Sequence, residues 1–108
     1  MDFIKIAGQR RPVKFGMLAN FKIEEIAGKS VNEFLDEYQQ TLSIRGLMTM
    51  LYAGFYAGAY LEKQEFDFEV QDMAAWIDQS EDGIILKLVD LFVESQPVDT
   101  DSDGEKGN

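Results

Sequence analysis

The sequence contains no cysteine and no histidine among its 108 residues. The absence of cysteine excludes disulfides, thiolate catalysis and cysteine-based zinc sites, and it fits a reducing compartment. The absence of histidine removes the commonest general base and the commonest transition-metal ligand of proteins. The carboxylates that remain show no spacing that predicts a paired acid and base. We therefore expect a noncatalytic protein without a cofactor or a bound metal.

No stretch of the chain is apolar enough to predict a secretory signal or a membrane span. The first 15 residues carry no long apolar run after their charged residues, which a secretory signal requires. The longest uncharged run, residues 46–61, has 16 residues, fewer than the roughly 20 that cross a bilayer. We expect a cytoplasmic protein that has no membrane partner.

Positive charge is scarce after the first quarter of the chain. Residues 1–29 hold six Lys and Arg against three Asp and Glu, whereas residues 30–108 hold four against seventeen, and the formal net charge is −10. Such a charge opposes binding to nucleic acid and aids solubility. The acidic residues either form solvated helix faces or meet a basic surface on a partner, and both interpretations stay open.

The N-terminal part has the pattern of a β-hairpin followed by two helices. Residues 3–6 and 12–15 partly alternate apolar with polar side chains around a turn-like segment over residues 8–11. A helical pattern begins near Met17 and ends at Gly28, a typical C-terminal cap. Ser30 and Glu33 have the spacing of a capping box, which predicts the start of a second helix.

A long central helix is predicted over about residues 43–63. One side carries apolar side chains at the spacing of a buried stripe, namely Ile44, Leu47, Met48, Leu51, Phe55 and Ala59. The opposite side is aromatic and small where a surface helix would be charged, and it includes Thr49, Ala53, Tyr56 and Tyr60. We interpret that side as an interface. The Gly54-x-x-x-Gly58 spacing lets either a neighbouring helix or a second copy of the chain approach closely.

Two further helices and a tail complete the predicted fold. Residues 64–68 form a connector, and the next helix carries Trp76, which we expect in the core with one edge exposed. Ser80 predicts the start of a final helix. Residues 97–108 hold one apolar side chain, Val98, and are predicted to form a disordered acidic tail. The expected fold is mainly α: a short N-terminal β-hairpin and about five helices in a small bundle, as one domain over residues 1–96.

Two short motifs begin like ligand-binding loops but are incomplete. Residues 28–30 match the end of a phosphate-binding P-loop, yet Ile23 stands where that motif needs its first glycine. Asp99, Asp101 and Asp103 match the opening of an EF-hand calcium loop, but no glutamate follows at its twelfth position. Neither motif predicts a specific ligand.

The order of these segments resembles the tail assembly chaperones of long-tailed phages and related gene transfer agents. The resemblance covers about residues 3–95 and has three landmarks. A basic strand leads into a first helix with a Glu-x-x-x-Gly-Lys-Ser type ending, matched by residues 24–30. A Leu-Tyr-Ala-Gly-like central helix is matched by residues 51–54, and an Ala-x-Trp-Ile-Asp-like segment by residues 74–78.

The resemblance implies a small noncatalytic protein that coats the long tape-measure protein during tail assembly. It further implies that the chaperone leaves before or as tail-tube subunits polymerise, acts in the host cytoplasm and is absent from the mature virion. The family often makes a second, longer product by ribosomal frameshifting, and an acidic tail suits the shorter one. The family has no fixed catalytic or ligand-binding residues that could be transferred to this sequence.

The predicted partner contacts are aromatic and come from the central helix and the connector after it. They are Tyr52, Tyr56 and Tyr60 together with Phe66 and Phe68, because tyrosine is enriched at interfaces. They would bind amphipathic segments of the tape measure or a second copy of this chain. The alternative function is a small acidic inhibitor or nucleic-acid mimic, whose carboxylates would bind a basic partner protein.

Overall fold

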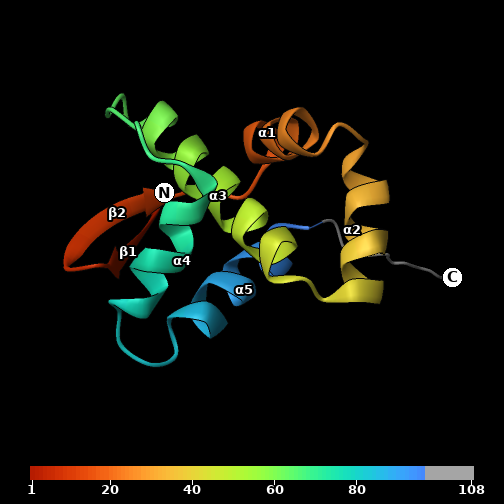
Figure 1. The fold of residues 1–108 in the computed structure, drawn as a ribbon. Helices are drawn as coiled ribbons and strands as arrows, with labels where there is room; N and C mark the ends of the chain where they lie inside the picture. The colour runs from red at the N-terminus through yellow and green to blue at the C-terminus, as the bar shows by residue number, and fades with distance from the viewer. Residues whose placement is uncertain (97–108) are drawn as a thin grey trace, which may run out of the picture.

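The computed structural model describes residues 1–96 and contains a two-stranded antiparallel hairpin followed by five helices (Figure 1). The elements are β1 (Asp2–Ile6), β2 (Gln9–Val13), α1 (Met17–Ala27), α2 (Val31–Thr41), α3 (Ile44–Leu61), α4 (Val70–Asp78) and α5 (Ile84–Ser95). The prediction of a mainly helical fold with an N-terminal hairpin is confirmed. The predicted acidic tail, residues 97–108, lies outside the described residues.

The hairpin turns over Ala7 and Gly8, and not over the predicted residues 8–11. The strands pair from Asp2 opposite Val13 to the pair of Ile6 and Gln9. Ala7 and Gly8 have φ angles of 53° and 78°, in the left-handed region that a two-residue turn uses to match the twist of its strands. The prediction was wrong because alanine gives no signal for such a conformation.

Gly28, Ser30 and Glu33 have the predicted capping roles around α2, and Ser43 adds a cap that was not predicted. Gly28 ends α1 with a φ of 71°, and its N–H donates to the carbonyl of Glu24. The Ser30 hydroxyl accepts from the Glu33 N–H while the Glu33 carboxylate accepts from the Ser30 N–H, which completes the capping box. The Ser43 hydroxyl caps α3 by accepting from the Gly46 N–H. These bonds fix the chain on both sides of α2.

The predicted start of the last helix at Ser80 is wrong. Helix α5 follows Gly83, which has a φ of 91°. The Ser80 hydroxyl instead accepts from the Ala7 N–H at 3.0 Å and donates to the Trp76 carbonyl at 2.7 Å. Ser80 therefore connects the end of α4 to the hairpin turn, and its oxygen is not available to cap α5.

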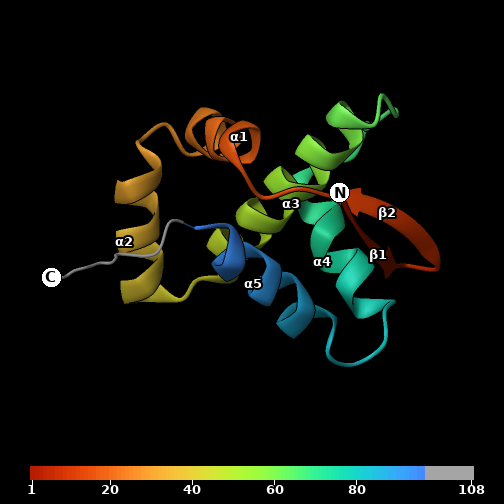
Figure 2. The same cartoon turned by 180° about the vertical axis from the view of Figure 1, so that it is seen from behind.

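Helix α3 runs through the centre of the molecule, and the hairpin, α1 and α4 pack against it (Figures 1 and 2). Met48 and Leu51 of the predicted stripe are buried, but Ile44 in the first turn is 69% exposed, contrary to the prediction. Thr49 and Ala53 on the opposite side are also buried. At Thr49 and Ala53, therefore, the expected interface with a partner is instead a contact with other parts of the same chain.

Gly54 and Gly58 accommodate the end of β2 and not a neighbouring helix, which corrects the prediction. A β-carbon on Gly54 would collide with the ring of Phe15, and one on Gly58 would collide with the backbone of Pro12. The Lys14 N–H donates to the Gly54 carbonyl at 3.0 Å. The two glycines therefore let the backbone after β2 lie directly on α3.

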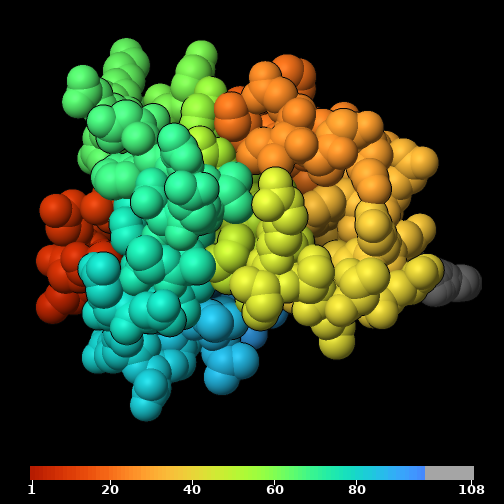
Figure 3. Space-filling model, in the orientation of Figure 1, coloured from red at the N-terminus to blue at the C-terminus, as the bar shows by residue number. Residues whose placement is uncertain are grey.

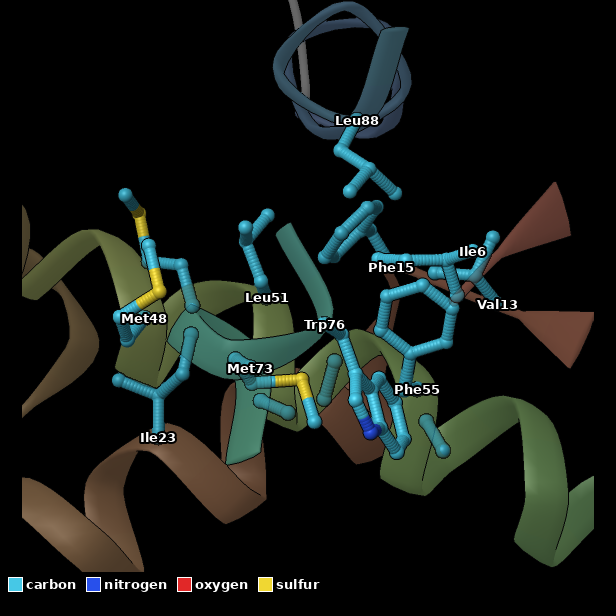
Figure 4. Close-up of a cluster of buried hydrophobic side chains, with 14 of the residues drawn as sticks. Ile6, Val13, Phe15, Ile23, Met48, Leu51, Phe55, Met73, Trp76 and Leu88 are labelled. Atoms are coloured by element: carbon cyan, nitrogen blue, oxygen red, sulfur yellow. The ribbon is translucent and has the colours of Figure 1, made fainter. Parts of the chain in front are cut away.

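The core lies where the hairpin, α1, α3, α4 and α5 meet (Figure 4). Leu88 of α5 points toward the ring of Phe15 on the segment after β2. Phe55 of α3 packs edge to face with Trp76 of α4, with 5.8 Å between ring centroids. Trp76 is 7% exposed, as expected for a core residue with one edge near solvent.

Candidate functional site

The structure brings the five predicted contact residues together. Tyr52, Tyr56 and Tyr60 lie on successive turns of α3, because their four-residue spacing is close to the 3.6-residue repeat of the helix. The connector between α3 and α4 returns along α3 and places the Phe66 ring 5.3 Å from Tyr52 and 6.2 Å from Tyr56. We refer to the following side chains as the aromatic cluster: Tyr52, Tyr56, Tyr60, Phe66, Phe68 and Trp76.

The two phenylalanines of the connector pack against both neighbouring helices, Phe66 against tyrosines of α3 and Phe68 against Trp76 of α4. The ring centroid of Phe68 is 4.6 Å from that of Trp76, with 74° between the ring planes. Phe66 lies 5.4 Å from Phe68 and 6.4 Å from Trp76, also edge to face. This geometry brings the positive edge of one ring to the negative face of the next, and each such pair contributes about 0.5–1.5 kcal/mol beyond burial. These contacts hold the rings in place before any partner binds. Binding to the cluster would therefore not require its side chains to become ordered first.

Exposure within the aromatic cluster rises from α4 toward the end of α3. Trp76 is buried, Tyr52, Tyr56, Phe66 and Phe68 are partly buried, and Tyr60 is 63% exposed. Figure 3 shows this face, where the connector and α4 lie over the C-terminal part of α3. A partner would therefore contact mainly Tyr60 and the outer edges of the neighbouring rings.

Arg11 of β2 lies against the inner side of the aromatic cluster, and sequence reasoning missed it. Its guanidinium carbon is 4.1 Å from the ring centroid of Trp76 and 4.8 Å from that of Phe68, a cation–π geometry. Its Nε is buried and has no hydrogen-bond partner within residues 1–96. Burial also lowers the pKa of Arg11 from its ordinary value. Strand alternation, which places Arg11 on the same side as Val13, could have indicated this burial once the turn was known.

Lys22 of α1 borders the aromatic cluster on another side. Its Nζ is 4.4 Å from the ring centroid of Tyr56 and 2.9 Å from a carboxylate oxygen of Glu25. The hydrogen bond to Glu25 raises the pKa of Lys22. Arg11 and Lys22 thus already occupy ring faces of the cluster, so its free surface suits apolar or aromatic groups better than a cationic ligand.

Tyr52 adds a polar group to the aromatic cluster. Burial raises the pKa of its hydroxyl, and the carboxylates of Glu69 and Asp72 act in the same direction, while Lys22 opposes them. The hydroxyl is therefore protonated near neutral pH and is a hydrogen-bond donor there.

Neither a metal-binding cluster nor a membrane-spanning helix occurs in the part of the chain that the structure describes. Residues 1–96 contain no group of three or more carboxylates placed to hold a metal ion. In the same residues, no helix has the length and apolar character that a membrane span requires.

No family model, curated protein or solved structure matches the chain. The resemblance to tail assembly chaperones therefore stays a prediction. Its landmarks have structural roles here, because Gly28 and Ser30 are caps, Gly54 contacts Phe15 and Trp76 is a core residue. Function is therefore inferred from the aromatic cluster and the charge of the chain.

Proposed function

We propose that this protein is a noncatalytic tail assembly chaperone, which binds and solubilises the tape-measure protein while a phage tail is built. The observation that carries the proposal is the preformed aromatic cluster, with Tyr60 63% exposed, on a chain of net charge −10. Long apolar helical segments of a client aggregate unless another surface covers them. A strongly charged chaperone keeps such a complex in solution.

Binding would use the exposed end of the aromatic cluster. Tyr60 lies 6.1 Å from Tyr56 between ring centroids, and the pair presents apolar edges that fit the apolar stripe of a client helix. One such contact is weak. Many copies along one long client would gain strength through multivalency, whereas each copy could still be displaced by tail-tube subunits.

Co-expression with a tape-measure protein tests this proposal. We expect the wild-type chain to raise the soluble fraction of the client and Tyr60→Ser to weaken client binding about tenfold, as truncation of an interface tyrosine typically does. Phe21→Ser is the matched control, because Phe21 is 65% exposed on α1 and lies outside the aromatic cluster. Equal client solubility with wild type and Tyr60→Ser, or equal losses with both variants, would count against the proposal.

The net charge favours a second candidate, an acidic inhibitor or nucleic-acid mimic that binds a basic protein. The salt dependence of binding affinity distinguishes the two functions. Between about 50 mM and about 500 mM NaCl, affinity for a basic partner should fall steeply, because exposed charges are screened over a Debye length of about 10 Å or less. Client binding through the aromatic cluster should fall little over the same range, since burial of apolar surface drives it.

A further inference from the structure

A groove with apolar walls lies between α2 and α5, and the N-terminal half of α3 forms its floor. It encloses about 300 Å³, and no charged side chain lines it. Its lining includes Leu35 and Tyr38 of α2, Leu47 and Met50 of α3, and Val89 and Val93 of α5. Figure 2 shows α2 and α5 flanking this part of α3. The groove shares none of its lining residues with the aromatic cluster.

Helix α5 has more apolar surface than the described chain covers. Eight of its first ten residues are apolar, yet only Ile84 and Leu88 are fully buried against residues 1–96. Val93 is 62% exposed and Leu86 is 70% exposed. A helix that is apolar around most of its circumference is normally covered on more than one side. Part of this uncovered surface, at Val89, Phe92 and Val93, forms a wall of the groove.

Acidic residues border the groove on both sides. Asp36 follows Leu35 on α2 and stands three residues before the lining residue Gln39, and it is exposed. Asp90 of α5 stands in the same relation to Val89 and Val93, and it is exposed as well. Residues three apart are neighbours on a helix surface, so each carboxylate lies at the rim beside the lining residues of its own helix.

We propose that this groove binds one amphipathic helix of a partner protein, with an apolar stripe toward the groove and lysines or arginines on its flanks. An occupant of about three helical turns would match the length of α2 and α5 at 1.5 Å per residue. The carboxylates at the rim select basic flanks.

The same charges disfavour the two occupants that the chain itself could supply. Residues 97–108 contain four acidic residues, one lysine and a single apolar residue, Val98, so they offer little to an apolar groove with an acidic rim. A second copy would bring its own net charge of −10 toward Asp36 and Asp90. The groove therefore fits a basic helix from another protein, and this inference does not depend on the tape measure as the client of the aromatic cluster.

A labelled peptide of about 14 residues, built from leucine and lysine with leucine at the i, i+3, i+4 and i+7 positions, is the probe. Fluorescence anisotropy on the full chain should show saturable binding. A scrambled peptide of the same composition should bind at least about tenfold more weakly, because it cannot present an apolar stripe. An amphipathic leucine and glutamate peptide should not bind, because the rim repels it.

Val93→Lys places a charge on the groove wall and should lower the affinity for the leucine and lysine peptide at least about tenfold. Met17→Lys is the control, since Met17 is 84% exposed on α1 and the variant carries the same added charge. Equal binding of the amphipathic and scrambled peptides, or equal losses with both variants, would overturn the proposal, because both results indicate general charge attraction. Self-association that Val93→Lys abolishes would overturn it in favour of a second copy. Intact client solubility with Val93→Lys would show that the groove and the aromatic cluster act separately.

Discussion

Arg11 stabilises the inner side of the aromatic cluster through its contacts with Trp76 and Phe68. Arg11→Ala should lower the free energy of unfolding by about 1–2 kcal/mol, because the side chain contributes both cation–π contact and packing of its alkyl stem. Urea denaturation followed by Trp76 fluorescence measures this loss. Arg10→Ala is the control, since Arg10 is exposed and its guanidinium carbon lies 4.6 Å from the ring centroid of Phe3, outside the aromatic cluster. An equal effect of both substitutions would contradict the assigned role of Arg11.

Tyr52 should make the stability of the protein depend on alkaline pH. Burial raises the pKa of its hydroxyl above the ordinary value of 10.0, so folding favours the protonated phenol. This contribution is complete below pH 10 and is lost as the pH rises through the higher pKa of the folded state. Tyr52→Phe should therefore lose less stability above pH 10 than the wild type does, by urea denaturation at several pH values. The same decline in both proteins would contradict this prediction.

Five of the six members of the aromatic cluster were predicted from sequence, but the inclusion of Trp76 and the exposure of each member were not. The four-residue spacing of Tyr52, Tyr56 and Tyr60 places them on one side of any helix. Phe66 and Phe68 lie on a connector without a periodic pattern, so their contacts with Trp76 depend on tertiary structure. The contact of Arg11 likewise depends on the hairpin packing beside α4.

At the scale of elements, Gly54 and Gly58 of α3 determine how closely the hairpin approaches. Gly58→Ala gains about 1 kcal/mol of helix propensity. Its new β-carbon, however, would collide with the Pro12 backbone, which cannot rotate away as a side chain can. We expect a net loss of about 2 kcal/mol in the free energy of unfolding.

Gly16→Ala is the control for Gly58→Ala in urea denaturation. A β-carbon on Gly16 would meet only the end of the Lys14 side chain, at 3.6 Å, so this variant should lose less than about 1 kcal/mol. If Gly58→Ala were as stable as the wild type, the direct contact between β2 and α3 would be wrong.

Ser80 connects two elements that are far apart in sequence, the hairpin turn and the end of α4. Ser80→Ala leaves the partly buried Ala7 N–H without its acceptor, which should cost about 1–2 kcal/mol and speed hydrogen exchange at Ala7. Ser95→Ala is the matched control, because its exposed hydroxyl donates to the Phe92 carbonyl of its own helix. Unchanged exchange at Ala7 in Ser80→Ala would contradict the connection.

Local capping signals predicted element boundaries well where the partner of the cap is a near neighbour in sequence. Ser30 and Glu33 satisfy each other's backbone across one turn, so the sequence contains the whole motif. Ser80 looked like a cap by the same rule, but its hydroxyl bonds to Ala7, 73 residues away. No pattern near Ser80 contains that information.

At the scale of the whole molecule, the protein combines a strong negative charge with a partly exposed aromatic cluster. The sequence has a net charge of −10, and only ten of its residues are Lys or Arg. Two of these cations, Arg11 and Lys22, lie against aromatic rings, and Lys22 also pairs with Glu25. The combination of negative charge and aromatic surface suits a carrier that must hold apolar client segments in solution.

The mass of the complex with a tape-measure protein tests the central claim most directly. Size-exclusion chromatography with light scattering on the co-expressed pair should show one client with several copies of this chain, and Tyr60→Ser should reduce the number of copies bound. A chain that elutes at its own mass, 12.3 kDa, beside an insoluble client would contradict the account. A complex of unchanged mass with Tyr60→Ser would instead show that binding does not use the aromatic cluster.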